Sequence, residues 1–482
     1  MSTKNSVFSG VLWTFFEKVG VQILQFGISI VLARLLTPED YGLIGLLGIF
    51  MGISSTLVDS GLTISLIRKS SIERIDESTV FYFNVLFSFF LYASLFLSAN
   101  SIAMFFEQPL LESIIKVYAL TIIINAFSKI QLTLLTKSLN FRKQFFIMLP
   151  STLFSGLVGI VMALNGFGVW SLVGHALSSS LFKMIQLWIF NKWRPMLGFS
   201  IPLLREHLAF GLPLLGAGLL NTGFQQMTNI VFGKFFPPAQ LGFYIKAKNL
   251  QELPVSNIST TLSKVTLPVF AKISHDDILL KIAYRKVMVS VMFFLVPILT
   301  YMMVMSDEII VFLFGLKWLE SSNFLFYLCA AAMLYPLNAY NLNILNVKGK
   351  SNIVFKLEVV KKVIISINLV ILVYYGIQYF LIGSVIVSIL AYLLNSFYSG
   401  LLINYGILGQ VKDLILIFII NAFIGVTIYF AISIDQFSQF SVFSRLVISA
   451  ISFTSIYFIL LYIFNRNQLI EVKSWLINNK NK

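Results

Sequence analysis

The stretch Gly242–Ile273, GFYIKAKNLQELPVSNISTTLSKVTLPVFAKI, is long enough to cross a bilayer as a helix but is unusually polar for a span. A Lys or Glu at bilayer depth costs about 2.5–3.5 kcal/mol, so such residues normally face a bundle interior or a watery cavity. The stretch therefore predicts a helix that lines the path of a polar, anionic substrate. The alternative is that two of its charges only neutralise each other one turn apart. At helical spacing, one stripe of this helix carries Lys248, Glu252, Ser256, Ser259 and Ser263.

The composition of the whole chain predicts a polytopic helical membrane protein. Hydrophobic residues make up 58% of the 482 residues and charged residues only 11%. The net charge of +15 comes mainly from cations in short loops, where they act as topology signals and do not indicate nucleic-acid binding. The single Cys329 excludes an intrachain disulfide, and Glu17 and Lys18 interrupt the apolar region that a cleavable signal peptide needs.

Fourteen membrane-spanning helices are predicted, and the charge of their loops alternates. Loops after even-numbered spans are rich in cations, as at Arg68 and Lys69, whereas Arg34, Lys234 and Lys317 are exceptions on the other side. Since cytoplasmic loops carry the excess of Lys and Arg, both termini are predicted to be cytoplasmic. The spans lie at 9–36, 41–66, 79–105, 111–135, 145–165, 168–190, 208–233, 241–272, 283–305, 321–347, 354–375, 378–403, 412–434 and 442–464.

An internal repeat relates the two halves of the chain. LARLLTPEDYGL at Leu32–Leu43 matches FGKFFPPAQLGF at Phe232–Phe243 with an offset of 200 residues, and upstream Gln25 matches Gln225. Parallel repeats of this kind are typical of transporters whose substrate site lies between the halves. The predicted domains are a six-helix lobe at 1–191, an interfacial linker at 192–207, a second six-helix lobe at 208–405, helices 13 and 14 at 406–465, and a cytoplasmic tail at 466–482.

Short motifs along most of the chain add to this layout. They are Ser9-Gly10-x-x-Trp13, Val31 to Arg34 through Gly42, Asp59-x-Gly61 with Ser65, Leu267-Pro268-x-Phe270-Ala271-Lys272, and Phe314-Gly315-x-Lys317-Trp318. With these motifs the sequence resembles the multidrug/oligosaccharidyl-lipid/polysaccharide exporter superfamily. It is most similar to the polysaccharide-transport family, the O-antigen and capsule flippases related to colanic-acid and teichuronic-acid exporters. The resemblance implies that an undecaprenyl-pyrophosphate-linked oligosaccharide is moved across the bacterial inner membrane by alternating access, beside a polysaccharide polymerase and export machinery.

Charged and amide side chains inside the predicted spans are the candidate substrate-binding residues. A pyrophosphate that leaves water needs fixed cations to replace its hydration, and sugars need amides and hydroxyls. We therefore expect a site formed by Glu17, Lys18, Gln25, Asp59, Lys183, Gln225, Lys248 and Glu252. Asp59 could orient Lys18, cap a helix break near Gly61 or carry a proton, and of these we expect the pairing with Lys18. Lys18, Lys183 and Lys129 could instead extend to the inner headgroups.

The sequence also argues against nucleotide binding, metal binding and catalysis. There is no P-loop pattern, and the three histidines and one cysteine are scattered, so neither a nucleotide nor a metal site is predicted. No cofactor is expected, and no catalytic constellation is seen that would indicate an enzyme. Two alternatives remain open: a drug or cation antiporter of the same superfamily, which should carry acidic intramembrane residues, and a non-transport partner of a glycan polymerase.

Overall fold

The structure, a computed structural model, describes residues 3–59, 61–69, 71–434, 437 and 439–464, with the side chains of 3–18 and 260–265 left out of the description. Every regular element in these residues is helical. The helices are α1 (Thr3–Leu35), α2 (Pro38–Asp59), α3 (Leu62–Arg68), α4 (Arg74–Phe105), α5 (Leu110–Tyr118), α6 (Leu120–Lys137), α7 (Phe141–Leu164), α8 (Trp170–Phe190), α9 (Ile201–Phe235), α10 (Pro238–Lys272), α11 (Asp277–Val304), α12 (Ser306–Phe314), η1 (Leu316–Trp318), α13 (Ser321–Ala332), α14 (Tyr335–Val347), α15 (Ser351–Tyr375), α16 (Ile377–Ile403), α17 (Ile407–Ile432) and α19 (Val442–Phe464).

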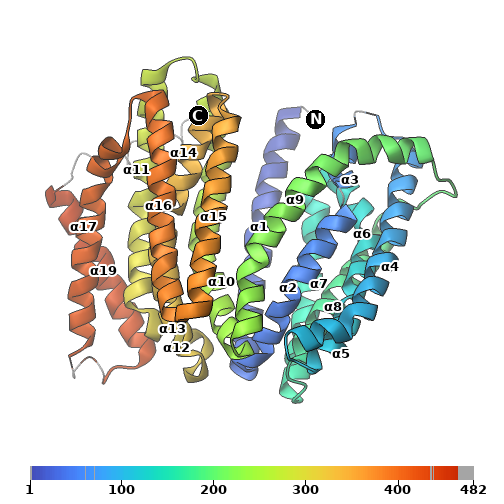
Figure 1. Cartoon of the computed structure of the whole chain (residues 1–482), viewed down its shortest axis with the longest axis horizontal. Helices are drawn as coiled ribbons and strands as arrows, with labels where there is room; N and C mark the ends of the chain where they lie inside the picture. Colours follow the sequence, from blue (N-terminus) through green and yellow to red (C-terminus); the bar gives the residue numbers. More distant parts are fainter. Residues whose placement is uncertain (1–2, 60, 70, 435–436, 438, 465–482) are drawn as a thin grey trace. The chain divides into compact units, whose positions relative to one another are not determined.

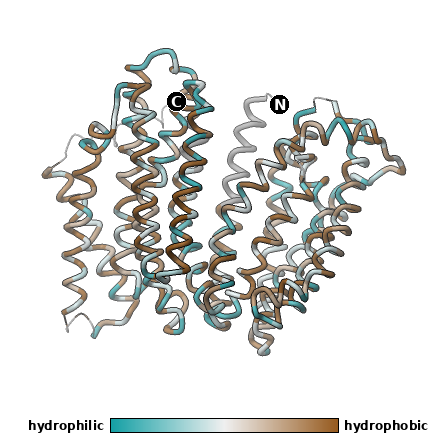
Figure 2. The backbone as a smooth tube through the Cα atoms, in the orientation of Figure 1, coloured by the Kyte–Doolittle hydropathy of each residue, from teal (hydrophilic) through white to brown (hydrophobic). Residues whose placement is uncertain are grey.

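The prediction of an all-helical membrane protein is confirmed. Each predicted span coincides with one helix or with a broken pair, the pairs being α2 with α3, α5 with α6 and α13 with α14. Within the described residues, nine segments are long and apolar enough to cross a membrane. Apolar residues follow the helix bodies, while polar residues gather at many of the helix ends (Figure 2). The number of fourteen spans and their grouping into six, six and two stay predictions.

The chain folds as two compact units, Met1–Gly242 and Phe243–Lys482. In the first unit, α7 packs between α1 and α8, and α9 packs along α2 (Figure 1). In the second unit, α11 packs on α17 and α13, around a core that includes the buried Tyr284, Met292 and Ile417. Helix α9 begins inside the predicted linker 192–207, and the predicted lobe boundaries remain predictions. The predicted tail at 466–482 lies outside the described residues.

The repeat motif of the sequence forms a close crossing of two helix starts. A Cβ added to Gly42 of α2 would lie 1.9 Å from the carbonyl oxygen of Pro238, and one added to Gly242 of α10 would lie 2.0 Å from that of Pro38. Real Cβ atoms do not approach a carbonyl oxygen so closely. The equivalent glycines of the two repeats therefore permit the first turns of α2 and α10 to touch backbone to backbone.

A second close approach fixes the first turns of α9. Gly61 has a φ of 67°, a left-handed conformation that favours glycine, and its added Cβ would lie 2.7 Å from the Cα of Gly211. Nearby, the buried His207 of α9 contacts Ser65 Oγ at 2.8 Å through Nδ1 and Asp76 Oδ1 at 3.2 Å through Nε2. These contacts tie α9 to both α3 and α4.

Asp76 also accepts a hydrogen bond of 2.7 Å from Lys69, which follows α3. This bond raises the pKa of the Lys69 ammonium, so the pair stays charged at neutral pH. The buried carboxylate of Asp76 is thereby compensated by a cation, as buried charges need to be.

The second unit holds a buried hydrogen-bond network between α11, α14, α16 and α17. The hydroxyl of Tyr284 donates to Asn341 Oδ1 at 2.7 Å, and Gln410 Nε2 donates to the same oxygen at 3.2 Å. At its edge, Asp413 accepts from Arg285 at 2.7 and 2.8 Å and from the Tyr405 hydroxyl. Burial raises the pKa of Tyr405 well above its usual range, so it donates as a neutral phenol. The network joins α17 to the rest of the unit.

Candidate functional site

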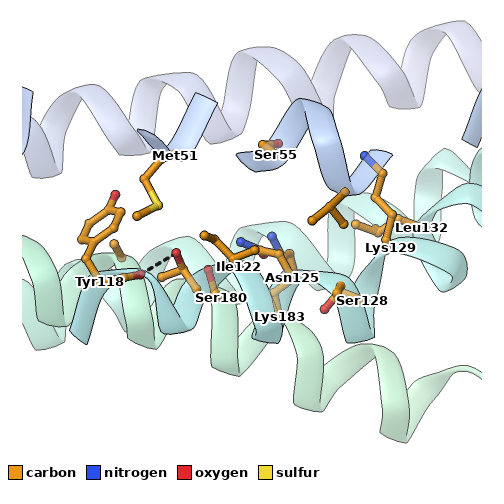
Figure 3. A pocket seen from close by; sticks show the side chains of 14 residues that line it. Met51, Ser55, Tyr118, Ile122, Asn125, Ser128, Lys129, Leu132, Ser180 and Lys183 are labelled. Carbon is orange, nitrogen blue, oxygen red and sulfur yellow. Dashed lines mark hydrogen bonds between the residues drawn. The ribbon is translucent and has the colours of Figure 1, made fainter. Parts of the chain in front are cut away.

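The first unit contains a cavity of about 410 Å³ between α2, α5, α6 and α8. Figure 3 shows side chains of all four helices around it. Its wall is mixed, with apolar side chains beside hydroxyls, one amide and two lysines. The lining residues are Met51, Ser55, Val58, Tyr118, Thr121, Ile122, Asn125, Ala126, Ser128, Lys129, Leu132, Ala176, Ser180 and Lys183.

Two lysines from different helices give the cavity its charge (Figure 3). Lys129 of α6 forms an ion pair with Asp59 at the end of α2, with Nζ 3.2 Å from Oδ2 and about one third of each side chain exposed. Lys183 of α8 has no carboxylate within 4.0 Å among the side chains that the structure describes. The cavity and its neighbour Asp59 thus hold two ammonium groups and one carboxylate.

Two side-chain oxygen atoms near the two lysines receive no hydrogen bond from the described residues. Within the described part of the chain, Asn125 Oδ1 and Asp59 Oδ1 are buried and have no hydrogen-bond partner. Thr121, by contrast, donates to the Tyr118 carbonyl at 2.7 Å and is satisfied inside its own segment. Since a buried unpaired acceptor costs about 1–3 kcal/mol, a hydroxyl-bearing ligand or water is favoured beside Asn125 and Asp59.

The structure places two of the predicted site residues, Asp59 and Lys183, at this cavity. Lys183 lines it, and Asp59 contacts its lining through Lys129. The observed ion pair of Asp59 uses Lys129, whereas Lys18 was the expected partner. The side chains of Glu17 and Lys18 lie outside the described residues, so their predicted role stays a prediction.

The other predicted residues do not line the cavity. Gln25 of α1 and Gln225 of α9 are exposed within the first unit. Lys248 and Glu252 belong to the second unit, where Glu252 is exposed and Lys248 Nζ lies 5.8 Å from the centre of the Tyr244 ring. Their convergence with residues of the first unit into one site therefore stays a prediction.

The predicted site omitted Lys129 and Asn125, although a signal for Asn125 is present in the sequence. Tyr118, Thr121, Asn125 and Ser128 recur every three or four residues and so share one face of the fourth predicted span. All four of these side chains line the cavity. The charge of Lys129 alone could not show whether the side chain points to this face or to the headgroups.

Comparison with known proteins identifies the family. The family model described as "Polysaccharide biosynthesis protein" matches residues 31–323, which is more than half of the chain. The chain belongs to this family. This member of the polysaccharide biosynthesis family is 24% identical to the lipopolysaccharide biosynthesis protein WzxC of Escherichia coli (strain K12), over 75% of the chain and 74% of WzxC. It is 23% identical to the succinoglycan biosynthesis transport protein ExoT of Rhizobium meliloti (strain 1021), over 65% of the chain and 63% of ExoT.

The fold is similar to that of the lipid II flippase MurJ in its inward closed conformation. The TM-score is 0.75, and the match covers 95% of this chain and 100% of MurJ at 15% sequence identity. At this identity the match shows a common fold. The predicted polysaccharide-transport family is confirmed by the family match, and the fold similarity to MurJ agrees with the predicted transporter fold.

Proposed function

We propose that this protein is a flippase, which moves an undecaprenyl-pyrophosphate-linked oligosaccharide from the inner to the outer leaflet of the bacterial inner membrane by alternating access. Family membership carries the proposal, because relatives with this sequence pattern are named for polysaccharide biosynthesis and, in the case of ExoT, for transport. The fold similarity to MurJ supports the same class of transporter. The protein would have both termini in the cytoplasm and would work beside a polysaccharide polymerase and export machinery.

The charge of the cavity supports an anionic substrate. Lys129 and Lys183 place two ammonium groups in a partly enclosed site, where they can replace the water and counterions of a pyrophosphate. Asn125, Ser128 and Ser180 offer an amide and hydroxyls to sugars. The membrane potential adds a driving force, since the outside is positive and outward movement of each negative charge gains about 2.3 kcal/mol per 100 mV.

The drug or cation antiporter is the second candidate. Such a transporter needs an unpaired intramembrane carboxylate that can bind a proton or a cation. At this cavity the carboxylate of Asp59 is paired with Lys129, and the two lysines outnumber it. An anionic substrate therefore fits this cavity better than a cationic drug.

Export of surface glycan in the source organism tests the proposal. The chromosomal copy is deleted, and the wild-type chain or a variant is returned at equal membrane levels. Lys183→Ala removes the charge-assisted hydrogen bond that Lys183 would donate to the pyrophosphate, so we expect glycan export to fall by about 10- to 150-fold. Lys18→Ala and Lys248→Ala test two of the other predicted site residues, and the exposed Lys350→Ala is the matched control.

The outcomes separate the site from the function. If deletion abolishes surface glycan and the wild type restores it while Lys183→Ala does not, the flippase and its cationic site are both supported. If all variants restore export equally, the flippase stands and the site is wrong. If deletion leaves glycan unchanged in a strain without a second flippase, the flippase proposal is wrong and drug export becomes the leading candidate.

A further inference from the structure

A second hollow in the first unit opens at the start of α7 and the end of α8. It is a groove of about 400 Å³ and shares no lining residue with the cavity described above. Its lining combines two cations with two aromatic rings and contains no acidic side chain. The six lining residues are Asn140, Arg142, Lys143, Phe146, Ile147 and Phe190.

Neutral groups hold Lys143 of the groove. Lys143 Nζ donates to the Phe190 carbonyl at 2.7 Å and to Asn191 Oδ1 at 3.0 Å, which uses two of its three N–H donors. The guanidinium carbon of Arg142 lies 5.9 Å from the centre of the Phe146 ring. These contacts fix the position of both groups without neutralising the positive charge of Lys143, so the groove attracts an anion.

The two aromatic rings of the groove are exposed on the surface of the first unit. Phe146 is 53% exposed and Phe190 is 59% exposed, and both stand on helices that the sequence predicts as spans. Arg142 and Lys143 are in the first turn of α7, which the predicted topology places at the cytoplasmic headgroup level. The groove thus offers cations where lipid phosphates lie and rings where acyl chains begin.

We propose that this groove binds the headgroup of an anionic phospholipid of the inner leaflet. Arg142 and Lys143 would contact the phosphate, and Phe146 and Phe190 would contact the first methylenes of the acyl chains. The two cations of the groove favour an anionic ligand. The two exposed rings favour a ligand that also has an apolar part, which a free phosphate lacks. The inference does not depend on the transported substrate, because the groove and the cavity have separate linings.

The test is lipid binding to the purified full-length chain in a neutral detergent. Native mass spectrometry counts bound phosphatidylglycerol or phosphatidylcholine during a titration. We expect tighter binding of phosphatidylglycerol, with about fivefold weaker binding for Arg142→Gln and about 25-fold for Arg142→Gln/Lys143→Gln, since each cation that contacts the lipid phosphate contributes a similar attraction. Binding should also weaken with added salt.

The matched control removes two positive charges that lie outside the groove. Lys192 and Lys350 are exposed and lie outside the groove, so Lys192→Gln/Lys350→Gln should bind phosphatidylglycerol as the wild type does. Lys143→Arg should keep most of the binding, and unfolding temperatures without lipid show whether each variant is folded. Equal losses in the control, or no loss in the groove variants, would overturn the proposal. Displacement of the lipid by millimolar inorganic phosphate would assign the groove to a free anion instead.

Discussion

Replacement of Gly42 by alanine tests whether the repeat motif is a backbone crossing. The added Cβ would lie 1.9 Å from the Pro238 carbonyl oxygen, whereas ordinary contact begins at 3.4 Å. The starts of α2 and α10 must therefore separate locally by about 1.5 Å, which is the difference between these distances. Gly242→Ala meets the same obstacle at the Pro38 oxygen, 2.0 Å away, and should have the same effect.

Both substitutions should lower the free energy of unfolding, because the added methyl group overpacks a close contact. Inserting a methyl group into a packed site typically costs about 1–3 kcal/mol, and the better helix propensity of alanine returns at most about 1 kcal/mol. For a unit the size of Met1–Gly242, each kcal/mol lowers the unfolding temperature by about 2–4 °C. Backbone amide exchange at the starts of α2 and α10 should accelerate about 5- to 150-fold where the substitution lowers the free energy of local opening by the full cost of about 1–3 kcal/mol.

The measurements are thermal unfolding and hydrogen exchange of the purified protein in detergent. Gly223→Ala is the matched control, because it is also a helical glycine of the first unit and its added Cβ meets no atom within 4 Å. Gly223→Ala should be as stable as the wild type or slightly more stable. Wild-type unfolding temperatures and exchange rates in both Gly42→Ala and Gly242→Ala would refute the crossing.

Three further predictions concern polar contacts of the first unit. Asp59→Asn removes the carboxylate beside Lys129, so pyrophosphate should bind the purified protein more tightly in calorimetry, and unchanged affinity would contradict this. His207→Ala leaves the buried Asp76 with one hydrogen bond fewer and should destabilise the fold by about 1–3 kcal/mol in thermal unfolding, more than a change at an exposed position. The hydrogen bond from Lys234 holds the pKa of the Glu107 carboxyl below its usual 4.5. This ion pair therefore stabilises the fold above pH 4.5, and the stabilisation is lost as the pH falls below that value. Glu107→Gln should abolish this part of the acid sensitivity of the unfolding temperature.

The helices could be predicted from the sequence because hydrophobic periodicity and length suffice to locate spans. The structure adds breaks that this signal does not carry. Span two, predicted at 41–66, is divided near Gly61, which has a left-handed backbone and closely approaches Gly211 of α9. A contact between residues 150 positions apart depends on tertiary packing and leaves no local pattern.

The candidate site was predictable only in part for the same reason. The spacing of polar residues along one helix defines a face, and Lys183 was found because a charge in a span needs a polar neighbour. Which neighbour it has depends on the packing of α2, α6 and α8. The observed partner of Asp59 is Lys129, which the sequence left ambiguous. The expected pairing with Lys18 stays a prediction, because that side chain lies outside the described residues.

In the proposed flippase, the ion pair of Asp59 and Lys129 would allow the cationic cavity to release its substrate as well as bind it. A transporter must bind its substrate and also release it, so a site with only unpaired lysines would hold a pyrophosphate too firmly in a low-dielectric environment. Asp59 lies 3.2 Å from Lys129 and competes with any phosphate oxygen for the same ammonium group, whereas Lys183 has no such competitor among the described side chains. One lysine can thus attract the anion while the other exchanges between the carboxylate and the substrate. This division of roles predicts that loss of Lys183 weakens binding, and that loss of Asp59 strengthens binding but slows export.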